Sequence, residues 1–141
     1  MKTKKTPRRK LAKKALELWA KIIRLKGSCE ICGKTNFLVA HHIVGKRNLR
    51  LRYDLRNGVC LCAGCHTMKR ESAHQDQVWF HFWLINNRSN DWNYIVENRE
   101  KLVFNVDYEE IIDKLSKIYK LKLGSESSGG VLGGEQGRVE E

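Results

Sequence analysis

Acidic residues are almost absent from the first 26 residues, which carry eleven lysines and arginines against the single acid Glu17. This segment therefore supplies +10 of the net charge of +11. Such an imbalance indicates contact with nucleic acid, because each phosphate that a lysine or arginine neutralises releases counterions. A solvated face on a packing helix would explain a helix here, but not the scarcity of acids. Arg8, Arg9 and Lys13 are the candidate phosphate contacts.

Long apolar runs are also missing, since none approaches the roughly 20 residues that span a membrane. No export signal precedes the charged start. We therefore expect a cytoplasmic protein that does not enter the membrane. In a reducing compartment, clustered cysteines bind metal more often than they form disulfides.

The cysteines are gathered between Cys29 and Cys65, and four of them form two Cys-x-x-Cys pairs, Cys29/Cys32 and Cys62/Cys65. Four thiolates from two tight turns can surround Zn²⁺ as a tetrahedron and close the intervening chain into a hairpin. Disulfides are the competing interpretation, but the total of five cysteines is odd. Cys60 lacks the turn spacing and is predicted to be a buried strand thiol.

Three of the five histidines, His41, His42 and His66, lie between Cys29 and the residue directly after Cys65. His41 and His42 follow an apolar run at residues 37–40 that predicts a strand, where successive side chains point to opposite faces. The two imidazoles can therefore take two roles, one as a metal ligand and one as a base. His66 is predicted to open a helix beside that strand. The alternative, a hydrogen-bonded structural histidine, would have to hold for all three residues.

The order Cys-x-x-Cys, His-His, Asn, Cys-x-x-Cys-His over residues 29–74 resembles the zinc-bearing branch of the HNH endonucleases. Their ββα-metal core is a hairpin plus a helix around one catalytic divalent ion. The segment LRYDLRN followed by CAGCH, then an aromatic helix and a lysine-rich one to about residue 122, is also similar to the phage NinG/Rap recombination endonucleases. Many members of that family carry Asn where this chain has His66.

The resemblance implies a role for each matching residue. His41 and His66 would bind the catalytic ion, Mg²⁺ or Mn²⁺, and His42 would be the general base that deprotonates water. A neutral imidazole is suited to that role at neutral pH. Asn57 would brace the loop and orient the base. If the gene is phage-encoded, the protein would act in the host cytoplasm.

The match is incomplete at one position. Many HNH motifs have another metal-binding histidine four residues after the last one, where this chain has Arg70. The coordination shell is then open to water, to the scissile phosphate, or to a nearby side chain such as His74 or Glu71. Arg70 could instead hold a phosphate oxygen.

A basic segment lies between the two halves of the hairpin. Beside a phosphodiester site such residues would clamp the DNA backbone, although a charge run is otherwise a solvated loop. The segment contains Lys46, Arg47, Arg50, Arg52 and Arg56.

Helical periodicity predicts an amphipathic helix from about Arg9 to Gly27, and a second helix that buries Val78, Trp79, Phe82, Trp83 and Ile85. His81 in that run is interpreted as structural. A short helix is expected over residues 91–101, and a capping box at Asp107 opens another through about Leu121. From Gly124 the glycine-rich composition predicts disorder.

The fold class is therefore α+β, a small ββα-metal core stapled by a Cys₄ zinc with flanking helices. Residues 1–26 form a basic arm and helix, residues 27–123 the nuclease domain with its C-terminal helices, and residues 124–141 the tail. The resulting hypothesis is a metal-dependent DNA endonuclease acting in phage recombination or DNA processing. The main alternative is a catalytically inactive zinc-stabilised DNA-binding module, and a weaker one is an RNA-directed nuclease. The sequence does not indicate an oligomeric state.

Overall fold

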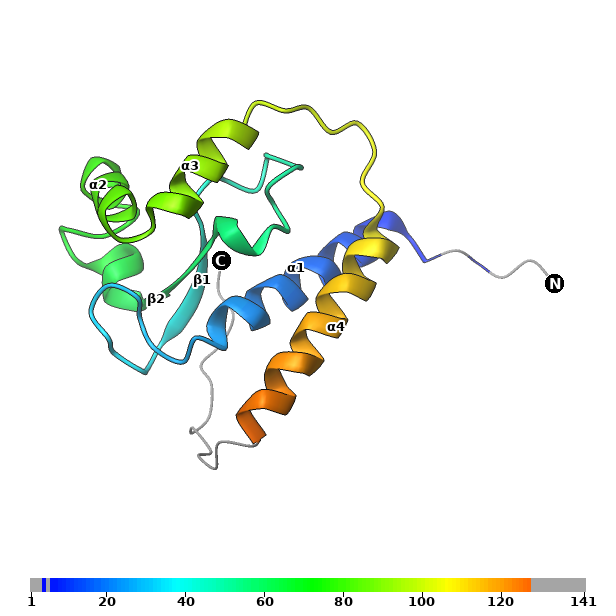
Figure 1. The fold of residues 1–141 in the computed structure, drawn as a ribbon, viewed down its shortest axis with the longest axis horizontal. Helices are drawn as coiled ribbons and strands as arrows, with labels where there is room; N and C mark the ends of the chain where they lie inside the picture. The colour runs from blue at the N-terminus through cyan, green and yellow to red at the C-terminus, as the bar shows by residue number, and fades with distance from the viewer. Residues whose placement is uncertain (1–3, 5, 128–141) are drawn as a thin grey trace.

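The computed structural model describes residue 4 and residues 6–127 (Figure 1). The elements in chain order are α1 (Arg8–Arg24), β1 (Leu38–His42), the 3-10 turn η1 (Leu55–Asn57), β2 (Gly58–Cys62), the π-helical turn η2 (Gly64–Met68), α2 (Gln77–Asn87), α3 (Ser89–Asn98) and α4 (Tyr108–Ser127). The predicted α+β class, with one small sheet among helices, is confirmed.

The two strands form an antiparallel hairpin at the centre of the molecule, with α1 and α4 on one side and α2 and α3 on the other (Figure 1). Leu38 pairs with Cys62 at one end of the hairpin, and His42 pairs with Gly58 at the other. Every residue of β2 is buried, as expected for a strand covered on both faces. Cys62 and His42 therefore lie at opposite ends of the hairpin.

Helix α1 is the amphipathic helix that the sequence predicts. Its buried residues, Ala15, Trp19, Ala20 and Ile22, recur at helical spacing. Trp19, Ala20 and Ile22 form an apolar cluster with Leu115 of α4, so that α1 and α4 lie side by side (Figure 1). Gly27, at φ 79°, turns the chain away after the helix ends.

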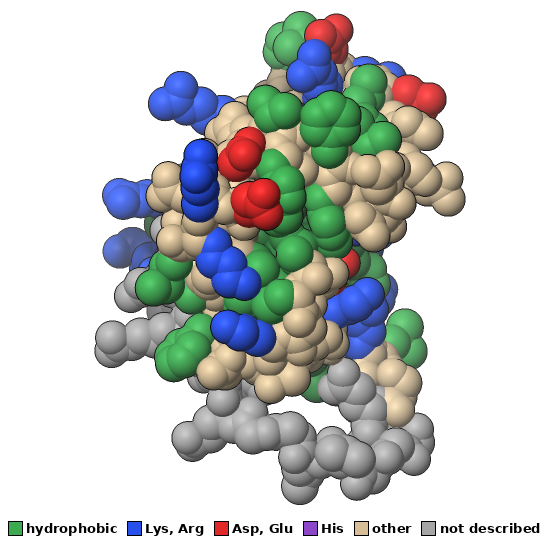
Figure 2. Space-filling view, turned by 90° about the vertical axis from the view of Figure 1, so that its left-hand side faces the viewer, with side chains coloured by type: hydrophobic (Ala, Val, Ile, Leu, Met, Phe, Trp, Pro, Cys, Tyr) green, Lys and Arg blue, Asp and Glu red, His purple; other side chains and the backbone are tan. Residues whose placement is uncertain are grey.

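The predicted buried face of α2 is wrong in three positions. Val78, Phe82 and Ile85 are 67%, 61% and 42% exposed, whereas Phe80 and Leu84 are the buried residues. Most residues of the helix are apolar, so the apolar positions do not define one face, and tertiary packing decides which side is buried. Figure 2 looks onto the side of the molecule where α2 lies, and apolar side chains are extensively exposed there.

The last two helices differ from their predictions mainly at their ends. Helix α3 begins at Ser89 and ends at Asn98, earlier than expected. The predicted cap of α4 is confirmed, since the Glu110 backbone N–H donates to Asp107 Oδ1 at 3.1 Å. Helix α4 continues past Leu121 to Ser127, and the rest of the tail predicted to be disordered lies outside the described residues. Among the described residues, no helix is long and apolar enough to cross a membrane.

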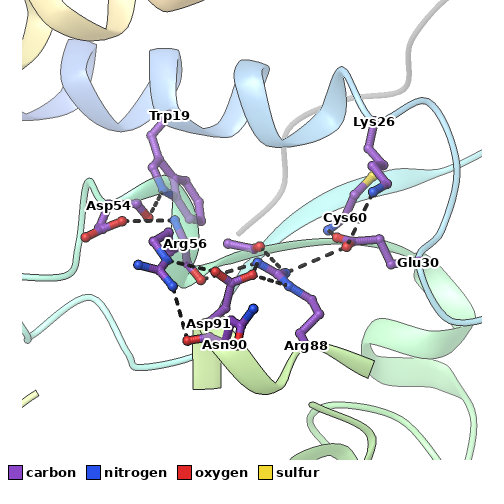
Figure 3. A network of polar contacts seen from close by, with 10 residues as sticks. Trp19, Lys26, Glu30, Asp54, Arg56, Cys60, Arg88, Asn90 and Asp91 are labelled. Atoms are coloured by element: carbon purple, nitrogen blue, oxygen red, sulfur yellow. Dashed lines mark hydrogen bonds and ion pairs between the residues drawn. The ribbon is translucent and has the colours of Figure 1, made fainter. Parts of the chain in front are cut away.

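Arg88, at the junction of α2 and α3, ties several segments to the start of β2 (Figure 3). Its guanidinium donates to the carbonyl oxygen of Gly58 at 2.6 Å and pairs with Asp91 at 2.9 Å. Asp91 also accepts from Arg56 at 2.8 Å. Burial raises the pKa of Asp91, but the hydrogen bonds from the two arginines outweigh it and hold that pKa below its usual range.

We expect Arg88→Ala to lower the free energy of unfolding by about 3 kcal/mol, because it removes the side chain that donates to the buried Gly58 carbonyl and leaves Asp91 with only one of its two arginines. Denaturant unfolding at neutral pH measures this loss. Arg99→Ala is the matched control, since Arg99 is exposed and its ion pair with Glu100 is 3.7 Å long, worth at most about 1 kcal/mol. Equal losses in the two variants would contradict a central role for Arg88.

Candidate metal centre and active site

The four cysteines of the two Cys-x-x-Cys pairs form one cluster, in which all the sulfur atoms lie within 4.8 Å of one another. Cys32 Sγ and Cys62 Sγ are 3.6 Å apart. Sulfur ligands about 2.3 Å from a tetrahedral Zn²⁺ would be about 3.8 Å apart, so the spacing fits that ion. The cluster therefore has the donor set and geometry of a structural zinc site.

The thiols differ in their electrostatic surroundings. A backbone hydrogen bond at Lys34, with further hydrogen bonds from the clustered cysteines, lowers the pKa of Cys32 to about 7 against the opposing effect of burial. Burial raises the pKa of Cys60 to about 12. Cys60 is fully buried in β2 and lies outside the cluster, as predicted, so it remains a neutral thiol.

A second cluster consists of His41, His66 and His74, which can each offer a ring nitrogen within the same 4.8 Å limit. The Nε2 atoms of His66 and His74 are 3.0 Å apart. Two ligands about 2.1 Å from one ion and at right angles to each other would have about that separation. The structure thus brings together the two predicted ligands and one of the alternatives left open for the third.

His74 reaches the cluster because the helix predicted to continue from His66 through Arg70 is not formed. The turn η2 ends at Met68, and the chain then bends back on itself. The Ala73 N–H donates to the Cys65 carbonyl at 2.9 Å, and the His74 N–H donates to the His66 carbonyl at 3.1 Å. These bonds place His74 beside His66, in a position that helical spacing would have given to Arg70.

The environment keeps the two predicted ligands, His41 and His66, neutral. Burial, followed by the charges of His66 and His74, lowers the pKa of His41 to about 3. Burial, followed by the charge of His74, lowers the pKa of His66 to about 4. Phe80 of α2 contacts the His41 ring edge-on at 5.3 Å between centroids. Neutral imidazoles present lone pairs, so a metal ion would not compete with protons here near pH 7.

His42 lies on the other side of β1 and has different neighbours. Its ring stacks on Trp19 of α1 at 3.8 Å between centroids and 9° between planes. Its Nε2 is 2.9 Å from the Arg52 carbonyl oxygen. A carbonyl only accepts, so Nε2 carries the proton and Nδ1 carries the lone pair of the neutral ring. The alternation of His41 and His42 across the strand is as predicted.

Asn57 is fully buried and bridges three backbone groups of the preceding loop. It accepts from the Val44 N–H at 2.8 Å and donates to the carbonyls of Val44 and Leu51 at 2.9 and 3.1 Å. Leu51 precedes Arg52, whose carbonyl holds His42. Asn57 therefore fixes the loop that carries the acceptor for His42.

The basic residues predicted to contact phosphate differ in their contacts within the protein and in their exposure. Arg50 donates to Asn98 Oδ1 at 3.0 Å, Arg56 pairs with Asp91 at 2.8 Å, and Arg8 donates to the Val106 carbonyl at 3.1 Å. These three are engaged within the protein. By residue exposure, Arg8, Arg50 and Arg56 are exposed, as are Arg9, Lys13, Arg47 and Arg70, whereas Lys46 and Arg52 are half-buried.

Residues 29–72 match the model of the HNH endonuclease family. The matched segment runs from Cys29 to just beyond η2, and it contains the hairpin with His41 and His42. This segment is similar to an HNH domain, and helices α1, α2, α3 and α4 lie outside the matched residues. No match was found among the curated proteins or among the solved structures.

Two residues at the site have only weak signals in the sequence. The match ends before His74, whose one signal is that it is the histidine nearest to His66 on the C-terminal side. Trp19 is predictable as a buried residue of an amphipathic helix, but nothing in the periodicity points to a histidine partner. Arg88 stabilises the hairpin from outside any motif.

Proposed function

We propose that the protein is a metal-dependent DNA endonuclease that hydrolyses phosphodiester bonds. The observation that carries this proposal is the arrangement of four imidazoles. Ring nitrogens of His41, His66 and His74 lie close together, and the ring of His42 is held in one tautomer by the Arg52 carbonyl. A zinc-stabilised binding module needs only the cysteines. The match to HNH endonucleases supports the same class of activity.

In the proposed mechanism, His42 Nδ1 accepts a proton from the attacking water. Its Nε2–H bond to the Arg52 carbonyl keeps that lone pair on Nδ1 and limits rotation of the ring. Asn57 maintains the loop that presents this carbonyl. The exposed Arg47 and Arg70 would contact substrate phosphates, which orients the scissile bond.

His41, His66 and His74 would hold a divalent ion, which when bound would neutralise charge on the phosphate and leaving oxygen. Mg²⁺ prefers oxygen ligands, whereas imidazole suits transition ions. Of the two ions expected from the sequence, Mn²⁺ therefore fits better than Mg²⁺, and Ni²⁺ or Zn²⁺ would fit the three nitrogens as well.

The direct test is to incubate the protein, purified with its zinc, with plasmid, branched and single-stranded DNA. Each substrate is combined with Mg²⁺, Mn²⁺, Ni²⁺ or EDTA. We expect cleavage that requires a divalent ion and is supported better by Mn²⁺ than by Mg²⁺. DNA binding without cleavage under every condition would favour the inactive binding module. A role in phage recombination would be supported by preferential cutting of the branched substrate.

We expect His74→Ala to lower the affinity of the second site for Mn²⁺ or Ni²⁺ by at least about 100-fold. Loss even of residues that only support a metal ligand typically costs 10–100-fold. Isothermal titration of the zinc-loaded protein measures this affinity. The matched control is His81→Ala, because His81 is exposed on α2 beside Trp92 and is outside the cluster. Unchanged affinity in the His74 variant would assign the third ligand to water or substrate.

A further inference from the structure

Helix α1 lies outside residues 29–72, yet it supplies the side chain that covers His42. Trp19 is 1% exposed, and its ring is nearly parallel to the imidazole at 3.8 Å between centroids. A fully buried indole in face-to-face contact blocks rotation of the imidazole out of its plane. The orientation of His42 is therefore set in part by a residue outside the HNH domain.

The same indole also holds the loop that carries the acceptor for His42. Trp19 Nε1 donates to the Asp54 carbonyl at 2.9 Å, as drawn in Figure 3. Arg52, two positions earlier in that loop, provides the carbonyl that accepts from His42 Nε2. One side chain thus fixes both the ring and the segment bearing its hydrogen-bond partner.

Gly58 gives independent support for this close approach of α1. A Cβ atom at Gly58 would lie 2.3 Å from Ile23 Cδ1 and 2.8 Å from Trp19 Cζ2. Gly58 is the residue paired with His42 in the hairpin. The backbone of β2 therefore touches α1 at the position paired with His42, where any side chain would require Ile23 and Trp19 to shift.

We propose that Trp19 is a positioning residue for His42, and that α1 is part of the active site. Stacking fixes the plane of the imidazole, and the bond to Asp54 keeps the Arg52 carbonyl in place to hold the proton on Nε2. The catalytic consequence rests on the proposed nuclease function, whereas the geometric part can be measured without it. Because α1 also carries the exposed Arg9 and Lys13, the helix proposed to contact phosphates is the one that positions the base.

The test compares Trp19→Phe and Trp19→Leu with the wild type, with melting temperature, zinc content, DNA affinity and single-turnover cleavage measured for each. We expect Trp19→Phe to keep only part of the cleavage rate, because a phenyl ring still provides a stacking face but cannot donate to the Asp54 carbonyl. Trp19→Leu should lose about 100-fold, as expected for a misplaced catalytic group, with little change in DNA affinity. Trp19→Phe keeps the test available if the leucine variant folds poorly.

Ile22→Ala is the matched control, because Ile22 is a buried α1 residue in the same apolar cluster as Trp19. It should lower the melting temperature while leaving the cleavage rate unchanged. If Ile22→Ala slows cleavage as much as Trp19→Leu, the effect comes from loosening α1, and the positioning role is overturned.

A structural measurement separates this inference from the nuclease proposal. In the wild type, the ring protons of His42 should show the NMR shift caused by the stacked indole, together with a proton on Nε2. Both signatures should be lost in Trp19→Leu and retained in Ile22→Ala. If the wild type cuts no DNA, the nuclease function fails, and these signals alone decide the positioning. Identical His42 spectra in the wild type and Trp19→Leu would overturn it.

Discussion

His42→Ala should reduce the rate of DNA cleavage by a factor of about 10² to 10⁴, the usual cost of losing a general base. The Arg52 carbonyl accepts a hydrogen bond from Nε2–H of His42. The lone pair that would take the proton from water is therefore on Nδ1. DNA affinity and zinc content should stay unchanged, because the imidazole belongs to neither metal cluster. Single-turnover cleavage in saturating Mn²⁺ measures the rate.

The control for this prediction is His81→Ala, which removes an exposed imidazole from α2 and should cut at the wild-type rate. Free imidazole added to the His42 variant should restore part of the lost rate, since the space beside Trp19 is left open. Wild-type cleavage by His42→Ala would assign the base to another group.

Cys65→Ser should release the zinc and unfold the domain, and this is the largest effect on stability that we expect. A structural zinc site supplies about 10–16 kcal/mol, whereas a domain of this kind is stable by only about 5–15 kcal/mol in total. Zinc release on titration and far-UV circular dichroism give the two measurements. Cys62→Ser should behave in the same way, because its sulfur lies in the same cluster.

Cys60→Ala provides the matched comparison for Cys62→Ser. Both cysteines are buried in β2, but Cys60 is not part of the cluster. It should keep a full complement of zinc and lose only a modest amount of stability. If Cys60→Ala loses the zinc and Cys62→Ser keeps it, the ligand assignment is wrong.

The metal-binding half of the site could be predicted from the sequence because ligand chemistry fixes local geometry. Two Cys-x-x-Cys turns can close around one ion in few ways, so Cys29 and Cys65 could be brought together without knowing the rest of the fold. The alternation of a strand likewise separates His41 from His42. Both arguments start from spacings that are short, within each Cys-x-x-Cys pair and between the adjacent His41 and His42.

Features that depend on tertiary packing could not be predicted in this way. The sequence does not show that η2 ends at Met68, because that end is set by backbone bonds from Ala73 and His74. The position of His74 as third member of the cluster follows from those bonds. The apolar composition of α2 does not distinguish Phe80, which is buried, from Phe82, which is exposed.

The pairing of α1 with α4 has a consequence for the order in which the protein is completed during synthesis. The apolar cluster around Trp19 includes Leu115, so part of the apolar face of the helix that covers His42 stays exposed until α4 has left the ribosome. The cysteines and the hairpin emerge well before that point and can already take up zinc. A nascent chain would thus carry a metallated hairpin before α1 is fully packed beside His42, and under the proposed nuclease function cleavage would also require α4.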